Sequence, residues 1–435
     1  MSDIHVRRGE TATLDRVEGE LKIGNNARIE ASNGKNVVIT KGVYLEGKAY
    51  VNCDLECDSL ESKTFLSKEI TFKVLSNKQR LEVTGRSVGR LEMNGNLNVH
   101  KQLNVSHTVQ IQGSIKAEDI DVGGRIQADA VNCSRIRVGG RADIKNTLEA
   151  SSVEVGGKIV AGVVKIGDLN VGGEAEVNGG SITGNIRVRG KFISKSPLEF
   201  GELLVYGRGS LPANCKGHRL STFGKINIDG NITCNFIQVS GVVEVLGDCH
   251  ADRIEVGGKF EVSGSLFVAD RLEGFGATSI AGNFDGKNFR FGGKFQANKI
   301  TVSEEADVSG KVETKEGFKA KQLNVRSGTQ IDGALVGELV EIGKSPDLSY
   351  GAWAPMLPTK FLTITGGNVK VQDVYAQEVL MGTMCKAARI FADTVNLEQG
   401  CTVEQVMYTK DLKTGFGVAI CQPPQKVTNL PPAPF

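Results

Sequence analysis

The sequence predicts an all-β protein, a right-handed parallel β-helix with about 17 residues per turn and about 20 or more turns. The first observation is a short apolar phrase ending in a glycine pair, which returns every 16 or 17 residues. The second is an alternation of apolar and polar residues within each repeat, typical of short strands with one buried face. The third is the position of the glycines, which recur at the same place in successive repeats.

The repeat is clearest between residues 120 and 190. It reads Ile120-Asp-Val122-Gly-Gly and returns in similar form four times before residue 190. The same position continues at steps of 16 to 18 residues through Leu103, Ile120, Ile136, Val153, Leu169, Ile186, Leu203, Leu220, Ile237, Ile254, Leu272, Phe289, Ala306, Leu323 and Val340. A period in this range indicates a solenoid, in which each repeat forms one turn and stacks on its neighbours.

Each repeat contains three pairs of apolar residues. One repeat shows them as Val153 and Val155, Ile159 and Ala161, and Val164 and Ile166. Three inward pairs predict three short strands per turn, each hydrogen-bonded to its equivalents in the turns on either side. The step of about 17 residues and the unequal spacing favour a right-handed coil over a left-handed hexapeptide helix, whose apolar residues recur every six. The glycine pair predicts a tight corner that needs positive φ, which glycine adopts without steric cost.

Residues 1–102 continue the pattern less regularly. Steps of 17 residues lead through Leu21, Val38, Leu55 and Phe72. Within this part, residues 62–90 hold seven basic and two acidic residues, an excess of five positive charges. We favour a solvated loop or hairpin for this basic region, and a surface for anionic lipid headgroups is the other interpretation.

The regular turns are expected over residues 103–343 and are interrupted at residues 344–360. This insertion holds three of the ten prolines, Tyr350 and the only tryptophan, Trp353. It is either a partner contact built on these aromatic residues or a loop folded back on the solenoid. Further turns are expected over residues 361–412, followed by a segment at 413–435 whose proline content is typical of an extended or disordered tail.

Composition limits the partners and the compartment. The 52 basic and 50 acidic residues are balanced, so a nucleic acid partner is not indicated. Nine cysteines without paired spacing favour a reducing compartment. The first residues show no signal-peptide pattern, and no stretch of 18 apolar residues is present. The sequence therefore predicts a soluble cytoplasmic protein.

No catalytic, cofactor-binding or metal-binding motif stands out. Acidic residues such as Asp121 and Glu154 lie singly between inward residues and share their place in the turn with Arg137. This pattern predicts ladders of charge on a solvated face. An enzyme acting on carbohydrate would instead need a cluster of charged and aromatic residues inside a cleft, and long insertions that would wall one are few.

Two cysteine–histidine neighbours are candidate chemical sites. His218 lies near Cys215, and His250 follows Cys249. A thiolate and an imidazole brought together by stacking would bind zinc or form a nucleophilic pair. Neither neighbourhood has the ligand spacing of such sites, so ordinary core cysteines are favoured.

The phrase I-x-V-G-G-x-x-x-A at 17-residue steps resembles the bactofilins, prokaryotic cytoskeletal proteins built on a right-handed parallel β-helix. The resemblance is best over residues 103–343 and extends from about residue 9 to about residue 408. It implies self-assembly into filaments without nucleotide, and a scaffold for cell shape that recruits other cytoskeletal or cell-envelope factors, often at the membrane. This chain departs from the family in its many turns and in lacking an obvious apolar membrane motif near its start.

The terminal turns are where such a polymer would join, because an end turn exposes unpaired backbone groups and a cross-section of the core. A head-to-tail contact between unlike ends gives a filament without limit, and contacts between like ends give a non-polar one. The expected interface residues are Ile4, Val6, Leu14 and Val17 at one end and Val403, Val406, Phe416, Val418 and Ile420 at the other. Alternatively, residues 416–435 fold over the last turn and stop growth there.

Other protein classes remain as alternatives to a polymer. A β-helix enzyme that acts on carbohydrate would show the cleft described above. A surface adhesin is disfavoured by the cysteines and by the start of the chain. A hexapeptide acyltransferase would need a strict six-residue period, which this chain lacks.

Overall fold

The computed structural model describes residues 2–34, 36–46, 49–51, 53–62, 71–74, 80–83, 85–94, 96–98, 102–326, 328–344 and 369–435. For residues 54–62, 71–74, 80–83, 85–94, 98, 106 and 344 it describes the backbone alone. The described chain is all-β, with 74% of residues in strands and no helix. It divides into two compact units, Met1–Gly217 and His218–Phe435, which are described separately.

The strands of the first unit are β1 (Ile4–Val6), β2 (Thr11–Leu14), β3 (Arg16–Val17), β4 (Leu21–Ile23), β5 (Arg28–Ala31), β6 (Asn36–Leu45), β7 (Ala49–Val51), β8 (Asp54–Ser62), β9 (Thr71–Val74), β10 (Arg80–Val83), β11 (Gly85–Asn94), β12 (Asn96–Asn98), β13 (Gln102–Gln112), β14 (Ser114–Lys116), β15 (Asp119–Val122), β16 (Arg125–Val138), β17 (Arg141–Val155), β18 (Lys158–Val171), β19 (Glu174–Val177), β20 (Gly180–Val188), β21 (Lys191–Ser194), β22 (Leu198–Val205) and β23 (Arg208–Pro212).

The boundary between the units falls within β24 (Cys215–Thr222). The strands of the second unit are β25 (Lys225–Asp229), β26 (Ile232–Val239), β27 (Val242–Val245), β28 (Cys249–Val256), β29 (Lys259–Val262), β30 (Leu266–Gly274), β31 (Ala277–Ile280), β32 (Phe284–Phe291), β33 (Lys294–Val308), β34 (Lys311–Arg326), β35 (Gln330–Asp332), β36 (Leu335–Lys344), β37 (Lys370–Met381), β38 (Lys386–Leu397), β39 (Thr402–Thr414), β40 (Ala419–Ile420) and β41 (Gln425–Lys426).

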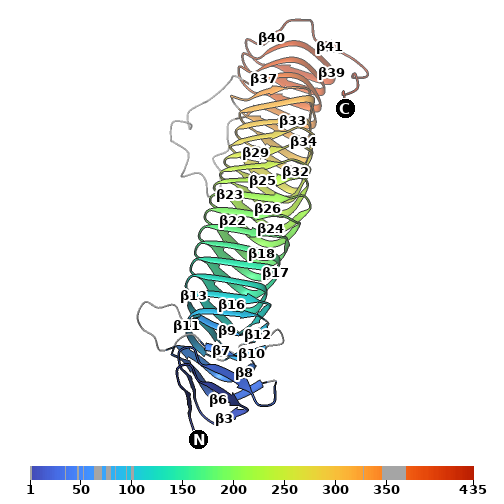
Figure 1. Cartoon of the computed structure of the whole chain (residues 1–435). Helices are drawn as coiled ribbons and strands as arrows, with labels where there is room; N and C mark the ends of the chain where they lie inside the picture. Colours follow the sequence, from blue (N-terminus) through green and yellow to red (C-terminus); the bar gives the residue numbers. More distant parts are fainter. Residues whose placement is uncertain are drawn as a thin grey trace. The chain divides into compact units, whose positions relative to one another are not determined.

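The strands are parallel and form a β-solenoid of about 20 turns, with equivalent residues roughly 17 apart (Figure 1). The register predicted over residues 103–343 is confirmed wherever its pairings are described. Ile136 pairs with Ile120 on one side and with Val153 on the other. In the second unit, Ile254 pairs with Leu272 and Leu323 with Val340. The all-β solenoid predicted from the repeat is therefore correct.

Each turn has three faces, as the three apolar pairs predict. Val153 and Val155 lie on what we call the first face, Ile159 and Ala161 on the second, and Val164 and Ile166 on the third. All six side chains are at most 3% exposed. Alternate residues along each strand point into the core, so every turn buries one pair per face against the turns beside it.

The corner glycines are needed for a different reason than the one predicted. None of the Gly-Gly pairs at the first-face corners between Gly123 and Gly293 has positive φ, although Gly310, in register with Gly293, does, as do Gly179 and Gly180 at a different corner. The corners instead stack too closely for a side chain. A Cβ on Gly172 would stand 2.5 Å from the carbonyl oxygen of Gly156 in the turn before, and one on Gly140 would stand 2.6 Å from that of Gly124. Close approach of backbone to backbone therefore selects glycine here.

The steps of 17 residues predicted through Leu21, Val38, Leu55 and Phe72 are wrong. Leu55 pairs with Val37 and not with Val38, and Phe72 pairs with Ala49 of β7. Leu21 pairs with Val43, 22 residues later, whereas Val38 pairs with Arg16 on another face. The second turn is longer because residues 32–34 form an additional turn at its corner, where Oδ1 of Asn33 accepts the Asn36 N–H. A polar insertion at a corner leaves the inward alternation intact, so the sequence pattern did not reveal it.

The insertion at residues 344–360, with Tyr350 and Trp353, lies outside the described residues apart from the backbone at its first position. The solenoid continues after it, because Val340 of β36 pairs directly with Val379 of β37. The basic region at 62–90 is described only in the backbone of its strands, so its charged surface also lies outside the described side chains.

Candidate functional site: the terminal turns

The first turn of the solenoid is made of β1, β2 and β3, one strand on each face. Each pairs with the second turn: Ile4 with Leu21 of β4, Ala12 with Ile29 of β5, and Val17 with Ile39 of β6. Among the described residues, no strand pairs with the opposite edge of any of the three. The backbone donors and acceptors on that edge are therefore available for a further turn.

The side chains of the first turn differ in how far they are exposed at the open end. Of the predicted interface residues, Val6 and Val17 are at most 2% exposed, whereas Ile4 and Leu14 are only half-buried. Leu21, which lies one turn further in and stacks on Ile4, is fully buried. The difference arises because the first turn is covered on one side only. Part of an apolar cross-section thus faces outward beside an unpaired strand edge.

The last full turn is built differently, because the chain folds over it. Residues Thr402 and Val403 of β39 pair with β40, and Met407 and Tyr408 pair with β41. Val403 and Val406, which were predicted to form the C-terminal interface, are fully buried under this cover. The folding of residues 416–435 over the last turn, raised above as the alternative, is therefore what the structure shows.

The other predicted C-terminal residues belong to the covering segment itself. Val418 and Ile420 are half-buried, and Phe416 is 85% exposed. The cover stops short of the first face, where residues 411–414 of β39 pair with β38 on one edge. No described strand pairs with their other edge, and Leu412 is half-buried there. This end is thus closed on two faces and open on one.

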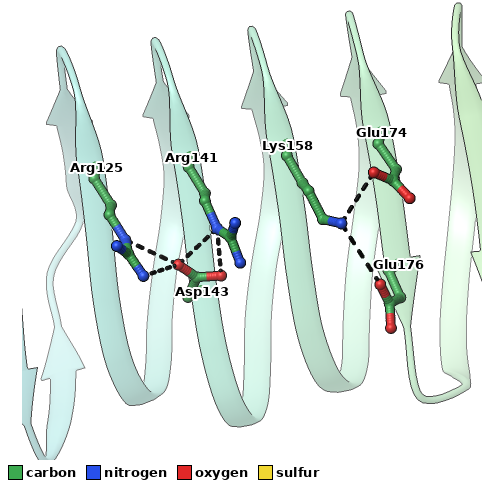
Figure 2. Close-up of polar contacts among 6 residues, drawn as sticks. All are labelled: Arg125, Arg141, Asp143, Lys158, Glu174 and Glu176. Carbon is green, nitrogen blue, oxygen red and sulfur yellow. Dashed lines mark hydrogen bonds and ion pairs between the residues drawn. The ribbon is translucent and has the colours of Figure 1, made fainter.

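The described outer faces carry ion-pair ladders. Figure 2 shows Arg125 and Arg141 on either side of Asp143, with Nη2 of Arg125 2.6 Å and Nε of Arg141 2.8 Å from its carboxylate. Further along, Nζ of Lys158 lies 2.9 Å from Glu174 and 3.8 Å from Glu176. Each of these carboxylates is paired with a cation of the turn beside it, and Asp143 is also paired with Arg141 of its own strand.

The charge ladder predicted for the first face is present as well. Asp121, Arg137 and Glu154 occupy register positions in three consecutive turns. Nε of Arg137 lies 2.9 Å from the Glu154 carboxylate, and both side chains are about half exposed. Alternating signs one turn apart stabilise the stack weakly, as solvated pairs do.

The ion pair between Lys158 and Glu174 makes a pH-dependent contribution to the free energy of unfolding, and its sign follows from the pKa shift. Hydrogen bonding to Lys158 lowers the pKa of the Glu174 carboxyl. A lowered native pKa contributes stability above the unfolded value of 4.5, and that stability is lost as the pH falls through the native value. Since both side chains are about one-third exposed, Glu174→Gln should cost less than about 1 kcal/mol at pH 7 and a smaller amount at pH 3, where more of the carboxyl is protonated. Urea unfolding at both pH values measures this, and an equal cost at both would contradict it.

The two cysteine–histidine neighbours do not form sites. Cys215 and Cys249 are fully buried, whereas His218 and His250 are exposed on the outer face. This separation follows from strand alternation, which sends adjacent residues to opposite sides. His250 instead stacks on Phe267 with ring centroids 4.6 Å apart. No group of three or more potential metal ligands occurs among the described residues.

Burial also makes the core thiols poor nucleophiles, because it disfavours the charged thiolate. It raises the pKa of Cys133 and of Cys234 to about 12, and that of Cys385 to about 11. Cys421, in contrast, is exposed. At pH 8 we expect iodoacetamide to alkylate Cys421 in minutes and the three core thiols only after unfolding in urea. Mass spectrometry of tryptic peptides reads this out, and rapid labelling of Cys234 in the folded protein would contradict it.

One shallow hollow on the second unit comes nearest to a ligand site. His250, Phe267, Asp252, Asp285 and Asn235 are among the residues that line it. Nδ2 of Asn235 donates to Oδ2 of Asp252 at 2.6 Å. The hollow therefore combines a stacked aromatic pair with carboxylates, but one carboxylate already has a partner.

The arrangement of the described chain defines a class, the parallel β-solenoid proteins. Searches of protein-family models, curated proteins and solved structures find no match to this chain. None of the described segments forms a helix with the length and apolar character required to cross a bilayer. Its function therefore has to be argued from its own surfaces.

Sequence reasoning missed one part of the C-terminal end, the contact made by Phe435. Its ring occupies the space where a side chain of Gly317 would stand, and Nζ of Lys299 lies 5.2 Å from the ring centroid. Lys299 lies in β33, Gly317 in β34 and Phe435 at position 435. No local sequence pattern connects these three positions. Only the path of the folded chain brings them together.

Proposed function

We propose that this protein is structural and self-assembles through the ends of its β-solenoid into nucleotide-free filaments that act as a scaffold. The observation that carries the proposal is the first turn. Its three strands have unpaired outer edges among the described residues, and Ile4 and Leu14 are half-buried beside them. Such an edge is a template for another strand unless it is covered or blocked.

The first turn also contains no proline. Proline removes a backbone donor and is a common guard of exposed edges. The first proline of the chain is Pro197, so none lies in the early turns. A second copy that stacks on this end would bury the apolar cross-section and pair the free backbone groups, which are the two contributions that hold neighbouring turns together within the chain.

The resemblance to the bactofilins extends this proposal to a cytoplasmic cytoskeletal polymer. On that resemblance alone we also propose that it recruits cell-envelope or other cytoskeletal factors and associates with the membrane surface. The ion-pair ladders fit a scaffold, since they use the charged side chains of the described faces within the stack.

The test is negative-stain electron microscopy with sedimentation velocity on the purified protein, without nucleotide, over a hundredfold range of concentration and at low and high salt. We expect end-joined assemblies whose share grows with concentration. Monodisperse single chains under every condition would overturn the proposal. Binding of a phospholipid vesicle, with and without anionic lipid, tests the membrane association separately.

A carbohydrate-active enzyme is the second candidate, and the hollow beside His250 and Phe267 is the observation in its favour. An aromatic face with nearby carboxylates is a common platform for sugar rings. Release of reducing ends from a panel of polysaccharides, lost in Asp285→Asn, would support this reading. A panel without any turnover or binding would remove it.

A further inference from the structure

We propose that residues 416–435 form a releasable strap that closes the C-terminal end of the solenoid, and that its release exposes this end to the first turn of a second copy. We call residues 416–435 the C-terminal strap. In Figure 1 it loops beyond β39 and turns back outside the stack. This inference rests on the proposed function and adds a regulation of it.

The strap is held by backbone contacts with little burial behind them. Ala419 and Cys421 donate N–H bonds to the carbonyls of Cys401 and Val403, each at 2.9 Å, and Val427 donates to Tyr408 at 2.8 Å. No residue from 416 to 435 is buried, and only five are even half-buried. A regular turn buries three apolar pairs, so the strap is the most weakly anchored turn of this end.

The surface beneath the strap is, by contrast, apolar and ready for another turn. Val403 and Val406 are fully buried where the strap covers them. Leu412, on the face that the strap leaves uncovered, is only half-buried. Without the strap, all three faces of β39 would present a free edge and part of their apolar pairs, as the first turn does at the other end.

The order of the faces matches the incoming end. Successive strand pairings lead from β2 to Ile159 on the second face. They lead from β3 to Val164 on the third face, so β1 lies on the first. Stacked on β39, β1 would meet residues 411–414, while β2 and β3 would occupy the places of β40 and β41. With the strap in place, only the partner for β1 is free.

The strap also prevents further stacking on its own outer side. Its two strands have two residues each, and Pro423 and Pro424 separate them. Pro431, Pro432 and Pro434 follow where a strand on the first face would continue. Since proline has no N–H to donate, these positions cannot continue a ladder. The strapped end is therefore a stop, and growth there requires the strap to leave.

Phe435 is the contact that fastens the strap at its far end. Its ring fills the notch at Gly317 and lies over Nζ of Lys299. Gly317 has φ of +133°, a conformation that keeps other residues out of this notch. The contact lies several turns back from β39, so it tethers the end of the segment without covering the edge itself.

The test uses full-length Phe435→Ala, with Phe416→Ala as the matched control because Phe416 is 85% exposed in the same segment. Hydrogen exchange at the amides of Ala419, Cys421 and Val427 reports strap release directly. We expect about tenfold faster exchange in Phe435→Ala and a fall of about tenfold in the concentration at which assemblies form, since apparent affinity follows the competent fraction. The control should change neither.

A lock supplies the opposite change. Thr402 and Ala419 are register partners with side chains outside the core, about 4.8 Å apart as neighbouring strands are, which suits a disulfide. In Thr402→Cys/Ala419→Cys on the Phe435→Ala background, oxidation should return assembly to the wild-type level and reduction should restore the gain. Oxidised wild-type protein controls for the native cysteines.

The outcomes separate the two proposals. Faster exchange in the strap without any change in assembly, in a protein that does assemble, would overturn the strap inference and leave the proposed function standing. Unchanged exchange in Phe435→Ala would overturn the role of Phe435 as the fastener. If neither the wild type nor any strap variant assembles at any concentration, the proposed function itself fails.

Discussion

Leu14→Asp is expected to abolish end-to-end assembly. Leu14 is the inward, half-buried residue at the end of β2, on the open edge of the first turn. In an assembly it would be covered by a second copy, and an ionised carboxylate enclosed there without a partner loses its hydration. A penalty of about 3 kcal/mol or more raises the concentration needed for assembly at least about 100-fold. Sedimentation velocity and microscopy measure the loss.

The matched control is Thr11→Asp in the same strand. Thr11 is exposed, points away from the core and pairs in register with Arg28, so the same charge is added where water and a cation can accept it. Circular dichroism and hydrogen exchange over residues 103–343 show whether both variants keep their fold. Assembly of Leu14→Asp at wild-type concentrations, with the fold intact, would refute the first turn as the joining surface.

Gly172→Ala is expected to destabilise the turns around it by about 3 kcal/mol. The added Cβ would stand 2.5 Å from the carbonyl oxygen of Gly156, which is backbone of the preceding corner and itself bonded into the stack. Neither corner can move without straining the hydrogen bonds that join the turns. Because a solenoid unfolds through local units, urea-dependent hydrogen exchange at residues 153–188 is the appropriate measurement.

Gly257→Ala is the control for this corner effect. Gly257 holds the same place after a first-face strand, but a Cβ there would meet only the Val239 oxygen at 3.7 Å, an ordinary contact. Its substitution should change stability by no more than about 0.5 kcal/mol. Equal destabilisation by the two alanines would mean that glycine is required for its backbone conformation after all.

The sequence predicted the fold because solenoid packing is local in register. Each inward residue contacts its equivalent about 17 positions away. Ile136, Val153 and Leu169 are therefore all apolar at the same position of the repeat, and the repeat can be detected in the sequence. Where a corner gains polar residues, as between Leu21 and Val43, the inward pattern persists but its spacing changes. A constant period then assigns the wrong pairing partner, because the additional corner residues lengthen the spacing between residues that pair.

The ends were harder to predict than the repeat. The apolar alternation of residues 4–17 predicted the residues of the first turn. The same reasoning named Val403 and Val406 as an open surface, although both lie beneath β40 and β41. The tail that covers them has a composition typical of disorder. It is held by backbone pairing and by the distant contact of Phe435, neither of which a local side-chain pattern encodes.

By itself the sequence determined the all-β solenoid, its three faces and the phase of its turns, because the burial of alternate residues at a constant period has few other solutions. Only the tertiary structure decided how the corners accommodate glycine and which faces of the two end turns stay open. The reason is that a corner contact such as Gly172 with Gly156, and a tether such as Phe435 at Gly317, depend on distances between backbone segments. Those distances exist only once the turns have stacked.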